Sequence, residues 1–333
     1  MRKRNIAAAL GFVFALTGMT VHAMADGIDD PRRADYFKAF AGKTIAFVPV
    51  TMGIDLTEGW AAVMKSQADR LGMKLEIRDP HFSADAGAQA ITSLIAEKPD
   101  VLVVHNPDVQ SYAKLLKRAE EAGIHVVQIN MRSNYNSDVY VGADWIGIGE
   151  AEAQGAIDKC GAGTSQKVAV LQGQPTSGSD SGMMKGVENA LAKHPDIKLV
   201  ANLAGEWDAT KAHSIVSTVI QQNPDLCAVI GFWDVMDLGA AAAIKESGKK
   251  IALVTSGGGE QMACDNVEKG VFDKEIAYQV MDQGRDLNDM IATVLESGLP
   301  AGKLKAVVYS PQLIISKDTL RPGLCWSASA LKK

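Results

Sequence analysis

Short apolar runs alternate with longer amphipathic segments from about residue 43 to residue 315. One such unit is Ala228–Ser247: the run Ala228–Ile230 is long enough only for a strand, the turn Gly231–Asp234 interrupts it, and an Ala-rich helical pattern then leads to Gly248. Apolar runs of this kind are typical of strands buried on both faces, which occur in parallel sheets with right-handed helical crossovers. The alternation therefore predicts an α/β fold.

The rhythm of strand and helix is long enough for two domains. We predict strands at 43–50, 74–78, 100–105, 125–130, 139–141, 167–171, 198–203, 228–230, 251–255, 275–280 and 306–315. We predict helices at 59–71, 86–97, 111–122, 147–160, 182–193, 211–222, 236–247, 260–269 and 283–297. The segment up to Gly42 is taken as a polar leader, and Asp85 as the N-cap of its helix. So many strands exceed one sheet of this kind and predict two doubly wound domains. Because no Pro- or Gly-rich linker separates them, several short crossings are expected.

The first 25 residues have the pattern of an export signal. Arg2-Lys3-Arg4 form a basic start, residues 6–20 form an apolar segment too short for a retained anchor, and Ala23-Met24-Ala25 is a small-x-small cleavage site. We predict cleavage after Ala25. The whole chain has a net charge of −5, and removal of the basic leader makes it more negative. An acidic exported protein is not expected to bind nucleic acid.

Four cysteines follow the leader, at Cys160, Cys227, Cys264 and Cys325. An even number in an oxidising compartment permits two disulfides, and three connectivities are possible. Cys227 opens a predicted strand and is expected simply to be buried. Cys325 in the tail is the better candidate for a disulfide that fixes the tail to the domain. Neither the cysteines nor the histidines have metal-ligand spacing. We therefore predict no metal and no cofactor.

Trp233 and Asp234 occupy the turn after the strand 228–230. In parallel α/β sheets such a turn lies at the carboxyl end of the strand, where ligands bind. An aromatic ring beside a carboxylate suits a small polar ligand with an apolar face. The alternative is that Trp233 packs in the core and Asp234 only caps the helix; the turn alone does not distinguish the two.

Other polar residues give no sign of catalysis. Ser256-Gly257-Gly258-Gly259 lacks the Lys-Ser/Thr of a phosphate-binding loop. His105 ends a predicted strand and is expected to be a hydrogen-bonded histidine, with contact to a ligand as the alternative. No nucleophile and base stand in a recognisable pattern, so we predict that the chain is not an enzyme, with an exported enzyme kept as the weaker alternative.

Four stretches, in this order and spacing, resemble a known family: KTIAFVPVTMGIDLTEGWAAVMKSQADRLGMKL, EKPDVLVVHNPDVQSYAKLLKRAEEAGIHVVQIN, VLQGQPTSGSDSGMMKGVENAL and CAVIGFWDVMDLGAAAAIKESG. They resemble the sugar-binding proteins of bacterial ABC importers, in the ribose- and galactose-binding group of type I periplasmic binding proteins, over residues 43–315. The resemblance implies two doubly wound parallel-sheet domains joined by a three-crossing hinge. It implies a signal peptide at 1–25, an N-terminal lobe at 43–142 plus 280–309, and a C-terminal lobe at 143–279 plus 310–325.

The resemblance also implies a set of ligand contacts in the cleft between the domains. The expected set combines carboxylates, amides and tryptophans at the ends of strands: Asp55, Trp60, Asn106, Asn130, Arg132, Asp180, Met183, Trp207, Trp233, Asp234, Gly257 and Gln279. A sugar's C–H face stacks on an aromatic ring, and its hydroxyls need amide and carboxylate partners in fixed geometry. A site of this kind rejects the wrong hydroxyl pattern because unpaired buried polar groups are costly.

Three positions depart from the family pattern. Met183 stands where the family usually has an arginine, Ser256-Gly257-Gly258 where it has an aspartate, and Asn130 where it has another aspartate. Much of the charged fork that holds a sugar ring is therefore missing. We predict an altered neutral ligand, such as a linear polyol or a deoxy or small sugar. A methylated ammonium compound, held by tryptophans and carboxylates, is the alternative.

The function implied is that of a periplasmic solute-binding component of an ABC importer. It would close its hinge on a small neutral polyhydroxy ligand and deliver that ligand to an ABC permease in the inner membrane, acting as a monomer. The alternative is a periplasmic sensor of the same fold that docks on a chemoreceptor or histidine kinase, with a methylated amine as a candidate ligand. The sequence does not separate these two roles.

Overall fold

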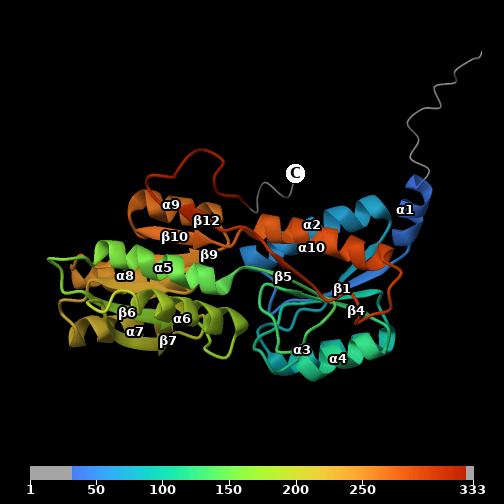
Figure 1. The fold of residues 1–333 in the computed structure, drawn as a ribbon, viewed down its shortest axis with the longest axis horizontal. Coiled ribbons are helices and arrows are strands. Elements are labelled where there is room, and N and C mark those ends of the chain that lie inside the picture. Colours follow the sequence, from blue (N-terminus) through green and yellow to red (C-terminus); the bar gives the residue numbers. More distant parts are fainter. Residues whose placement is uncertain (1–31, 328–333) are drawn as a thin grey trace, which may run out of the picture.

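The computed structural model describes residues 32–327, so the predicted signal peptide lies outside the described residues. Two six-stranded sheets form two lobes that lie side by side (Figure 1). The strands of the first sheet are, in spatial order, β11 (Ala306–Tyr309), β5 (Val139–Gly142), β4 (His125–Ile129), β3 (Val101–Val104), β1 (Thr44–Val48) and β2 (Lys74–Ile77). Those of the second are β12 (Leu313–Ile315), β10 (Lys274–Ala277), β9 (Ala252–Gly257), β8 (Ala228–Gly231), β6 (Lys167–Gln172) and β7 (Lys198–Ala204).

All strand pairs of the first sheet are parallel, and only β12 runs antiparallel in the second. Each sheet reverses its strand order beside its first strand, between β1 and β3 and between β6 and β8. Open α/β sheets bind ligands outside the carboxyl ends of the strands at such a switch point. The predicted fold class, two doubly wound α/β domains, is confirmed.

Helices cover both faces of each sheet (Figure 1). In the first lobe, α1 (Arg33–Phe40), α2 (Asp55–Leu71) and α10 (Val280–Glu296) share one face, and α3 (Ala84–Glu97) and α4 (Ala113–Glu121) share the other. In the second lobe, α5 (Trp145–Lys159) and α6 (Gly178–Leu191) share one face, and α7 (Ala209–Gln222), α8 (Asp234–Ser247) and α9 (Gln261–Lys269) share the other. Successive strand residues alternate between these faces: Val168 packs with α5 and α6, and Ala169 with the opposite layer.

The chain passes between the lobes three times, as predicted. It crosses after β5, after β10, and between β11 and β12. The second and third crossings are joined, because Gln279 Nε2 donates to the carbonyl oxygen of Pro311 at 2.8 Å. Gln279 also has a left-handed backbone with φ of 51°, which is uncommon for a residue with a side chain. Gln279 thus belongs to the hinge.

Three local predictions are wrong. The predicted strand 306–315 is two strands in different lobes, and Pro311, which cannot donate a ladder hydrogen bond, lies between them. The segment before Gly42 contains α1, whose Phe40 is buried in the core. Ser83, not Asp85, caps α3, because its side chain accepts from Ala86 N at 3.2 Å.

Both disulfides lie in the second lobe. Cys160 at the end of α5 pairs with Cys227 before β8, and Cys264 in α9 pairs with Cys325 in the tail. The structure therefore selects one of the three connectivities. The expectation that Cys227 is an unpaired buried residue is wrong, because the turn before β8 brings it next to the end of α5.

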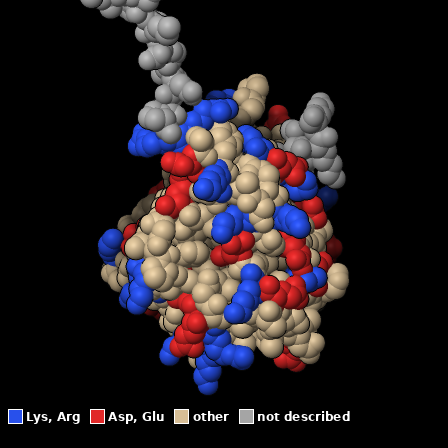
Figure 2. All heavy atoms as spheres, turned by 90° about the vertical axis from the view of Figure 1, so that its right-hand side faces the viewer, with Lys and Arg blue, Asp and Glu red and all other residues tan. Residues whose placement is uncertain are grey.

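Within residues 32–327, no helix is both long and apolar enough to cross a membrane. Figure 2 shows the end of the molecule formed by the first lobe, where basic and acidic side chains are interspersed. This face carries mixed charge and not the continuous basic patch that is typical of nucleic-acid binding.

Candidate ligand-binding site

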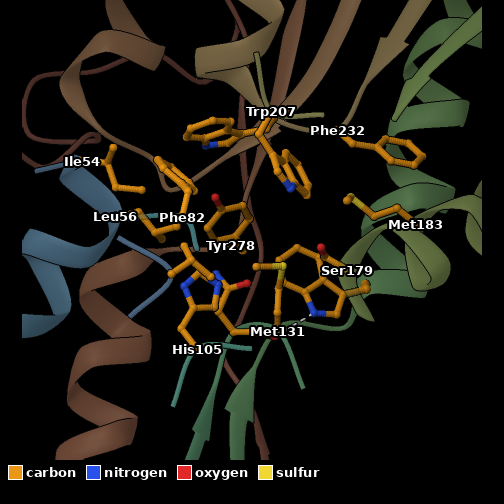
Figure 3. Close-up of a pocket in the computed structure, with 14 residues that line it drawn as sticks. Ile54, Leu56, Phe82, His105, Met131, Ser179, Met183, Trp207, Phe232 and Tyr278 are labelled. Atoms are coloured by element: carbon orange, nitrogen blue, oxygen red, sulfur yellow. Dashed lines mark hydrogen bonds between the residues drawn. The ribbon is translucent and has the colours of Figure 1, made fainter. Parts of the chain in front are cut away.

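A cavity lies where the two lobes meet, and the empty space there, including the open solvent at its mouth, is about 480 Å³. Its lining is drawn from both lobes, seven residues from each: Val50, Ile54, Leu56, Phe82, His105, Asn130 and Met131 from the first, and Trp145, Ser179, Met183, Trp207, Phe232, Trp233 and Tyr278 from the second. Most of these residues follow the carboxyl ends of parallel strands or begin the next helix. Figure 3 shows Trp207 and Phe232 facing His105 and Met131 across the space. The position is that of a small-molecule site.

His105 follows β3 and is buried at the wall of the first lobe. Neither ring nitrogen has a hydrogen-bond partner in the described chain. Burial lowers the pKa of the imidazole to about 3, so the ring is neutral at physiological pH. Its ring packs edge-to-face on Trp60, with centroids 5.1 Å apart. The expectation of a hydrogen-bonded strand-end histidine is wrong, and His105 is available to a ligand.

Asn130 follows β4 in a left-handed backbone conformation with φ of 60°. Its carbonyl oxygen accepts from Tyr140 Oη at 2.6 Å and from Trp145 Nε1 at 3.1 Å. These bonds hold the residue in a conformation that costs free energy, which is a feature of functional sites. The side-chain amide has one long contact, 3.5 Å from Nδ2 to Gln283 Oε1. The amide oxygen is therefore free for a ligand.

Trp207 and Trp233 form the aromatic wall of the second lobe. Their ring centroids are 5.9 Å apart at an interplanar angle of 81°. Trp207 follows β7 in a left-handed conformation with φ of 62°. Its ring lies directly over Gly173, where a Cβ atom would be 2.0 Å from the indole. Glycine at this position is therefore what allows the tryptophan to reach the cavity.

Ser179 and Met183 reach the cavity from the first turns of α6. That helix packs closely on α5, since a Cβ at Gly149 would be 2.0 Å from the carbonyl oxygen of Met183. The same contact brings Trp145, at the start of α5, to the cavity. Trp145 in turn packs on Tyr278, with centroids 5.2 Å apart. The α5–α6 pair thus sets one side of the site.

Four of the twelve residues expected from the sequence line the cavity: Asn130, Met183, Trp207 and Trp233. The remaining eight do not: Asp55, Trp60, Asn106, Arg132, Asp180, Asp234, Gly257 and Gln279. Trp233 precedes α8 without a side-chain capping bond. This placement favours the ligand-wall interpretation of the turn over simple core packing.

Several of the eight stand behind the wall. Trp60 lies in α2, not in a loop, and is fully buried in the core behind His105. Asn106 Nδ2 donates to Gln128 Oε1 and to the carbonyl of Met131, both at 3.0 Å. Asn106 therefore fixes the loop that carries Met131 into the cavity.

Two more expected contacts lie on the surface. Asp55 is exposed at the start of α2. Arg132 is also exposed, and its guanidinium lies 5.5 Å from the centre of the Tyr140 ring. Because neither side chain is part of the cavity lining, the cavity has no charged group from either loop.

Six buried carboxyl groups lie inside the second lobe, behind the cavity wall: Glu152, Asp180, Asp234, Asp237, Glu260 and Glu275. Burial raises the pKa of each, to about 7 for Asp180 and Glu260 and to about 8 for Asp237. Nearby carboxylates raise the pKa of Asp234 and Glu275 further. At Gly257, a Cβ would lie 2.4 Å from Asp234 Oδ2 and 2.8 Å from Glu275 Oε1. Gly257 and Asp234 thus belong to this carboxyl cluster.

Asp180 also belongs to the cluster and is hydrogen-bonded to Ser177 Oγ at 2.8 Å. Within residues 32–327, no group of three or more His, Cys, Asp or Glu residues is arranged to hold a metal ion. The six carboxyls therefore form a polar interior for the second lobe, and the cavity itself has a neutral lining.

The sequence reasoning missed most of the apolar lining, notably Phe82, Met131, Phe232 and Tyr278. Phe82 has a left-handed backbone with φ of 63°, and no local sequence pattern predicts this conformation. Phe232 precedes Trp233 in the turn after β8. Its position at the carboxyl end of a parallel strand could therefore have been used to predict it as a ligand contact.

Comparison of the chain with known proteins agrees with this two-lobe architecture. Residues 45–299 match the model of the periplasmic binding protein domain family. The chain therefore belongs to that family. It is 24% identical over 249 residues to a ribose import binding protein of Bacillus subtilis, covering 74% of this chain and 79% of the relative. It is 30% identical over 176 residues to a D-allose-binding periplasmic protein of Escherichia coli, covering 50% of this chain and 56% of the relative.

A solved structure with similar fold is an ABC transporter solute-binding protein from Mycobacterium smegmatis with bound glycerol. The TM-score is 0.76 at 22% sequence identity, and the match covers 87% of this chain and 96% of that one. At this identity the likeness shows the fold alone. The predicted family resemblance is thus confirmed by the family model and by the fold.

Proposed function

We propose that the chain is the solute-binding component of an ABC importer and that it closes its two lobes around one small neutral ligand, a sugar or sugar alcohol. The single observation that carries this proposal is the cavity between the lobes, which takes seven lining residues from each lobe. A ligand that touches both walls stabilises the closed arrangement over the open one, which is how hinge closure is driven.

Three features support a neutral ligand. The cavity lining contains no Asp, Glu, Lys or Arg among the residues that the structure describes. The histidine in the wall is neutral because its pKa is about 3. The indole rings of Trp207 and Trp233 offer flat apolar surfaces of the kind that stack on the C–H face of a ring. A charged ligand would have to leave water without an opposite charge in the lining.

The names of the relatives make carbohydrates the first ligand class to test. The ribose import binding protein and the D-allose-binding protein are named for sugars. Delivery to a permease in the inner membrane, export with cleavage after Ala25, action as a monomer and the lack of enzymatic turnover all belong to this proposal. No relative named above is a receptor-docking sensor, so the importer is the role that we propose.

The test is a thermal-shift screen of the refolded, ligand-free protein against pentoses, hexoses, sugar alcohols, glycerol and methylated amines. A ligand that binds only the folded state stabilises it by about 4 kcal/mol at a thousandfold excess over Kd. A hit is then titrated by calorimetry against wild type and Trp207→Ala. We expect the variant to bind at least about tenfold more weakly, because it loses most of one aromatic wall.

The matched control is Phe37→Ala, which removes an aromatic side chain of α1 that is 39% exposed and lies outside the cavity lining. Its affinity should equal that of wild type. If Trp207→Ala binds every hit as tightly as wild type does, the ligand does not occupy this cavity. Hits restricted to methylated amines would redirect the function toward those compounds.

A further inference from the structure

The cavity offers few hydrogen-bond acceptors to ligand hydroxyls. Of its fourteen lining residues, seven carry a nitrogen or oxygen in the side chain. Three of these seven are tryptophans, whose indole N–H can only donate. The acceptors must therefore come from His105, Asn130, Ser179 and Tyr278.

Part of this small set is already used within the protein. Trp145 Nε1 donates to Asn130 O at 3.1 Å and to Tyr140 Oη at 3.0 Å. Ser179 Oγ lies 3.0 Å from Ser177 Oγ and 3.4 Å from Asp180 Oδ2. The acceptors that remain are one nitrogen of the neutral His105, the amide oxygen of Asn130 and the hydroxyl of Tyr278. The amide oxygen has two lone pairs, so these three side chains accept about four hydroxyl protons at most.

Two of the unused acceptors lie on the first lobe and one lies on the second. His105 and Asn130 both stand on the first lobe, after neighbouring strands β3 and β4. Met183, Phe232 and Trp207 of the second lobe face His105 across the cavity (Figure 3). The ring of Trp233 packs against that of Trp207. A ligand hydroxyl that points toward Met183 or Phe232 meets sulfur or aromatic carbon, and on this side of the lining only Tyr278 offers an unused side-chain acceptor. A hexopyranose carries hydroxyls around its whole rim and cannot direct all of them to one side.

We propose that this site selects a ring-sized neutral solute with an apolar body and only one or two hydroxyl or carbonyl groups, which point to His105 and Asn130. This inference rests on the proposed function, and it narrows the ligand from a fully hydroxylated sugar to a deoxygenated or cyclic alcohol. Each hydroxyl left without a partner in a closed cavity lowers the affinity by about tenfold. The apolar body is held by the aromatic wall.

The experiment holds the carbon ring constant and varies only its hydroxyls. Cyclohexanol, trans-1,2-cyclohexanediol and myo-inositol carry one, two and six hydroxyls on the same six-membered ring. Each is titrated against the ligand-free protein by calorimetry, with D-ribose and D-allose in parallel. We expect the diol to bind at least about tenfold more tightly than inositol and both sugars.

The outcomes separate this inference from the proposed function. If D-ribose, D-allose or inositol binds as tightly as the diol or more tightly, and Trp207→Ala abolishes that binding, the importer proposal stands and the inference is overturned. If no ring compound binds, the inference is also overturned, whereas the importer proposal is decided by the broader screen. Diol binding that Trp207→Ala leaves unchanged places the diol outside the cavity and overturns the inference too.

His105→Leu tests the polar side of the cavity. The structure gives the His105 ring no hydrogen bond within the described chain, so its loss should not lower the melting temperature of the ligand-free protein. The affinity for the diol should fall about tenfold. A variant that melts earlier but binds the diol like wild type would show a purely structural role for His105, and the assignment of the polar side would be wrong.

Discussion

The two lobes have similar sheets but treat their buried polar groups differently. In the first lobe, the buried Gln128 accepts from Asn106 Nδ2 and from Ser133 and donates to Tyr135 O and to Ser137 Oγ. In the second lobe, both carboxyl oxygens of Glu275 have no hydrogen-bond partner in the described chain. The first lobe pairs a buried amide with other amides and hydroxyls, whereas the second lobe buries acids that have no cation beside them.

Among the ion pairs of residues 32–327, none involves any of the six buried carboxyls of the second lobe. An isolated buried charge is so costly that the group takes up a proton instead. The same lobe holds both disulfides. The second lobe is therefore cross-linked by disulfides and buries acids that avoid the cost of a buried charge by taking up protons, whereas the first lobe pairs its buried amides by hydrogen bonds.

The largest expected effect is that of pH. The buried acids of the second lobe have pKa values above those of the unfolded chain, at about 7 for Asp180 and about 8 for Asp237. Their stabilising contribution is complete below about pH 4 and is lost as the pH rises toward these folded values. The free energy of unfolding should fall between pH 5 and pH 8, by about 3 kcal/mol for an acid with the folded pKa of Asp180 and by about 4 kcal/mol for one with that of Asp237. Urea denaturation at several pH values measures it.

The first lobe should respond in the opposite direction and in a different range. Asp138 receives hydrogen bonds from His125 and from Leu304 N, which hold the pKa of its carboxyl below the usual value despite burial. The contribution of Asp138 to the unfolding free energy is complete above about pH 4 and is lost in stronger acid.

Asp237→Asn is the control for the second lobe. Because it removes one of the titrating carboxyls, the unfolding free energy should change less steeply with pH between pH 5 and pH 8. A protein equally stable at pH 5 and pH 8 would contradict the comparison.

Removal of one disulfide should have the next largest effect. The bond between Cys160 and Cys227 closes 67 residues of chain. The double variant Cys160→Ser/Cys227→Ser should lose about 4 kcal/mol of unfolding free energy, because the unfolded chain regains the entropy of that loop. Hydrogen exchange should show faster opening of β6 and β8 and unchanged protection of β3 and β4. Equal loss of protection in both sheets would show that the lobes unfold as one unit.

Breaking the network of the first lobe is the matched experiment. Gln128→Leu leaves Asn106 and Ser133 without their acceptor in a buried position. We expect a loss of about 3 kcal/mol, since an unsatisfied buried polar group costs about 1–3 kcal/mol. Denaturation at pH 7 measures it, and hydrogen exchange should place the loss in β3 and β4. An unchanged midpoint would mean that water replaces the lost partner.

The alternation of strands and helices was enough to predict the two-lobe fold, because burial on both faces leaves a pattern in every strand. It was not enough to divide 306–315, since β11 and β12 are both apolar and only their partners in different sheets separate them. The disulfide pattern was also beyond the sequence. Cys160 and Cys227 meet because α5 ends above the start of β8, which is a matter of tertiary packing.

The candidate site was predicted where it follows a strand directly, as with Asn130 and Trp233. Phe82 was missed because it reaches the cavity through an unusual backbone conformation. Tyr278 was missed although it directly follows β10. Trp60 was misplaced because α2 begins at Asp55 and turns the indole into the core. A family resemblance predicts where a residue lies along the chain, but it does not predict the direction in which the side chain points.

Glu275→Gln should have the smallest effect on the unfolding free energy. It is the second-lobe counterpart of Gln128→Leu in the first lobe. The amide has the same shape as the carboxyl, and the carboxyl is protonated because burial and then the neighbouring Asp234 raise its pKa. At pH 5 the change should alter the unfolding free energy by less than about 1 kcal/mol, since one uncharged polar group replaces another. At pH 8 the variant should be more stable than wild type, because it no longer has to hold a proton against the solvent. Destabilisation by 3 kcal/mol or more at both pH values would mean that Glu275 is charged and paired in solution, and the two lobes would then follow the same rule.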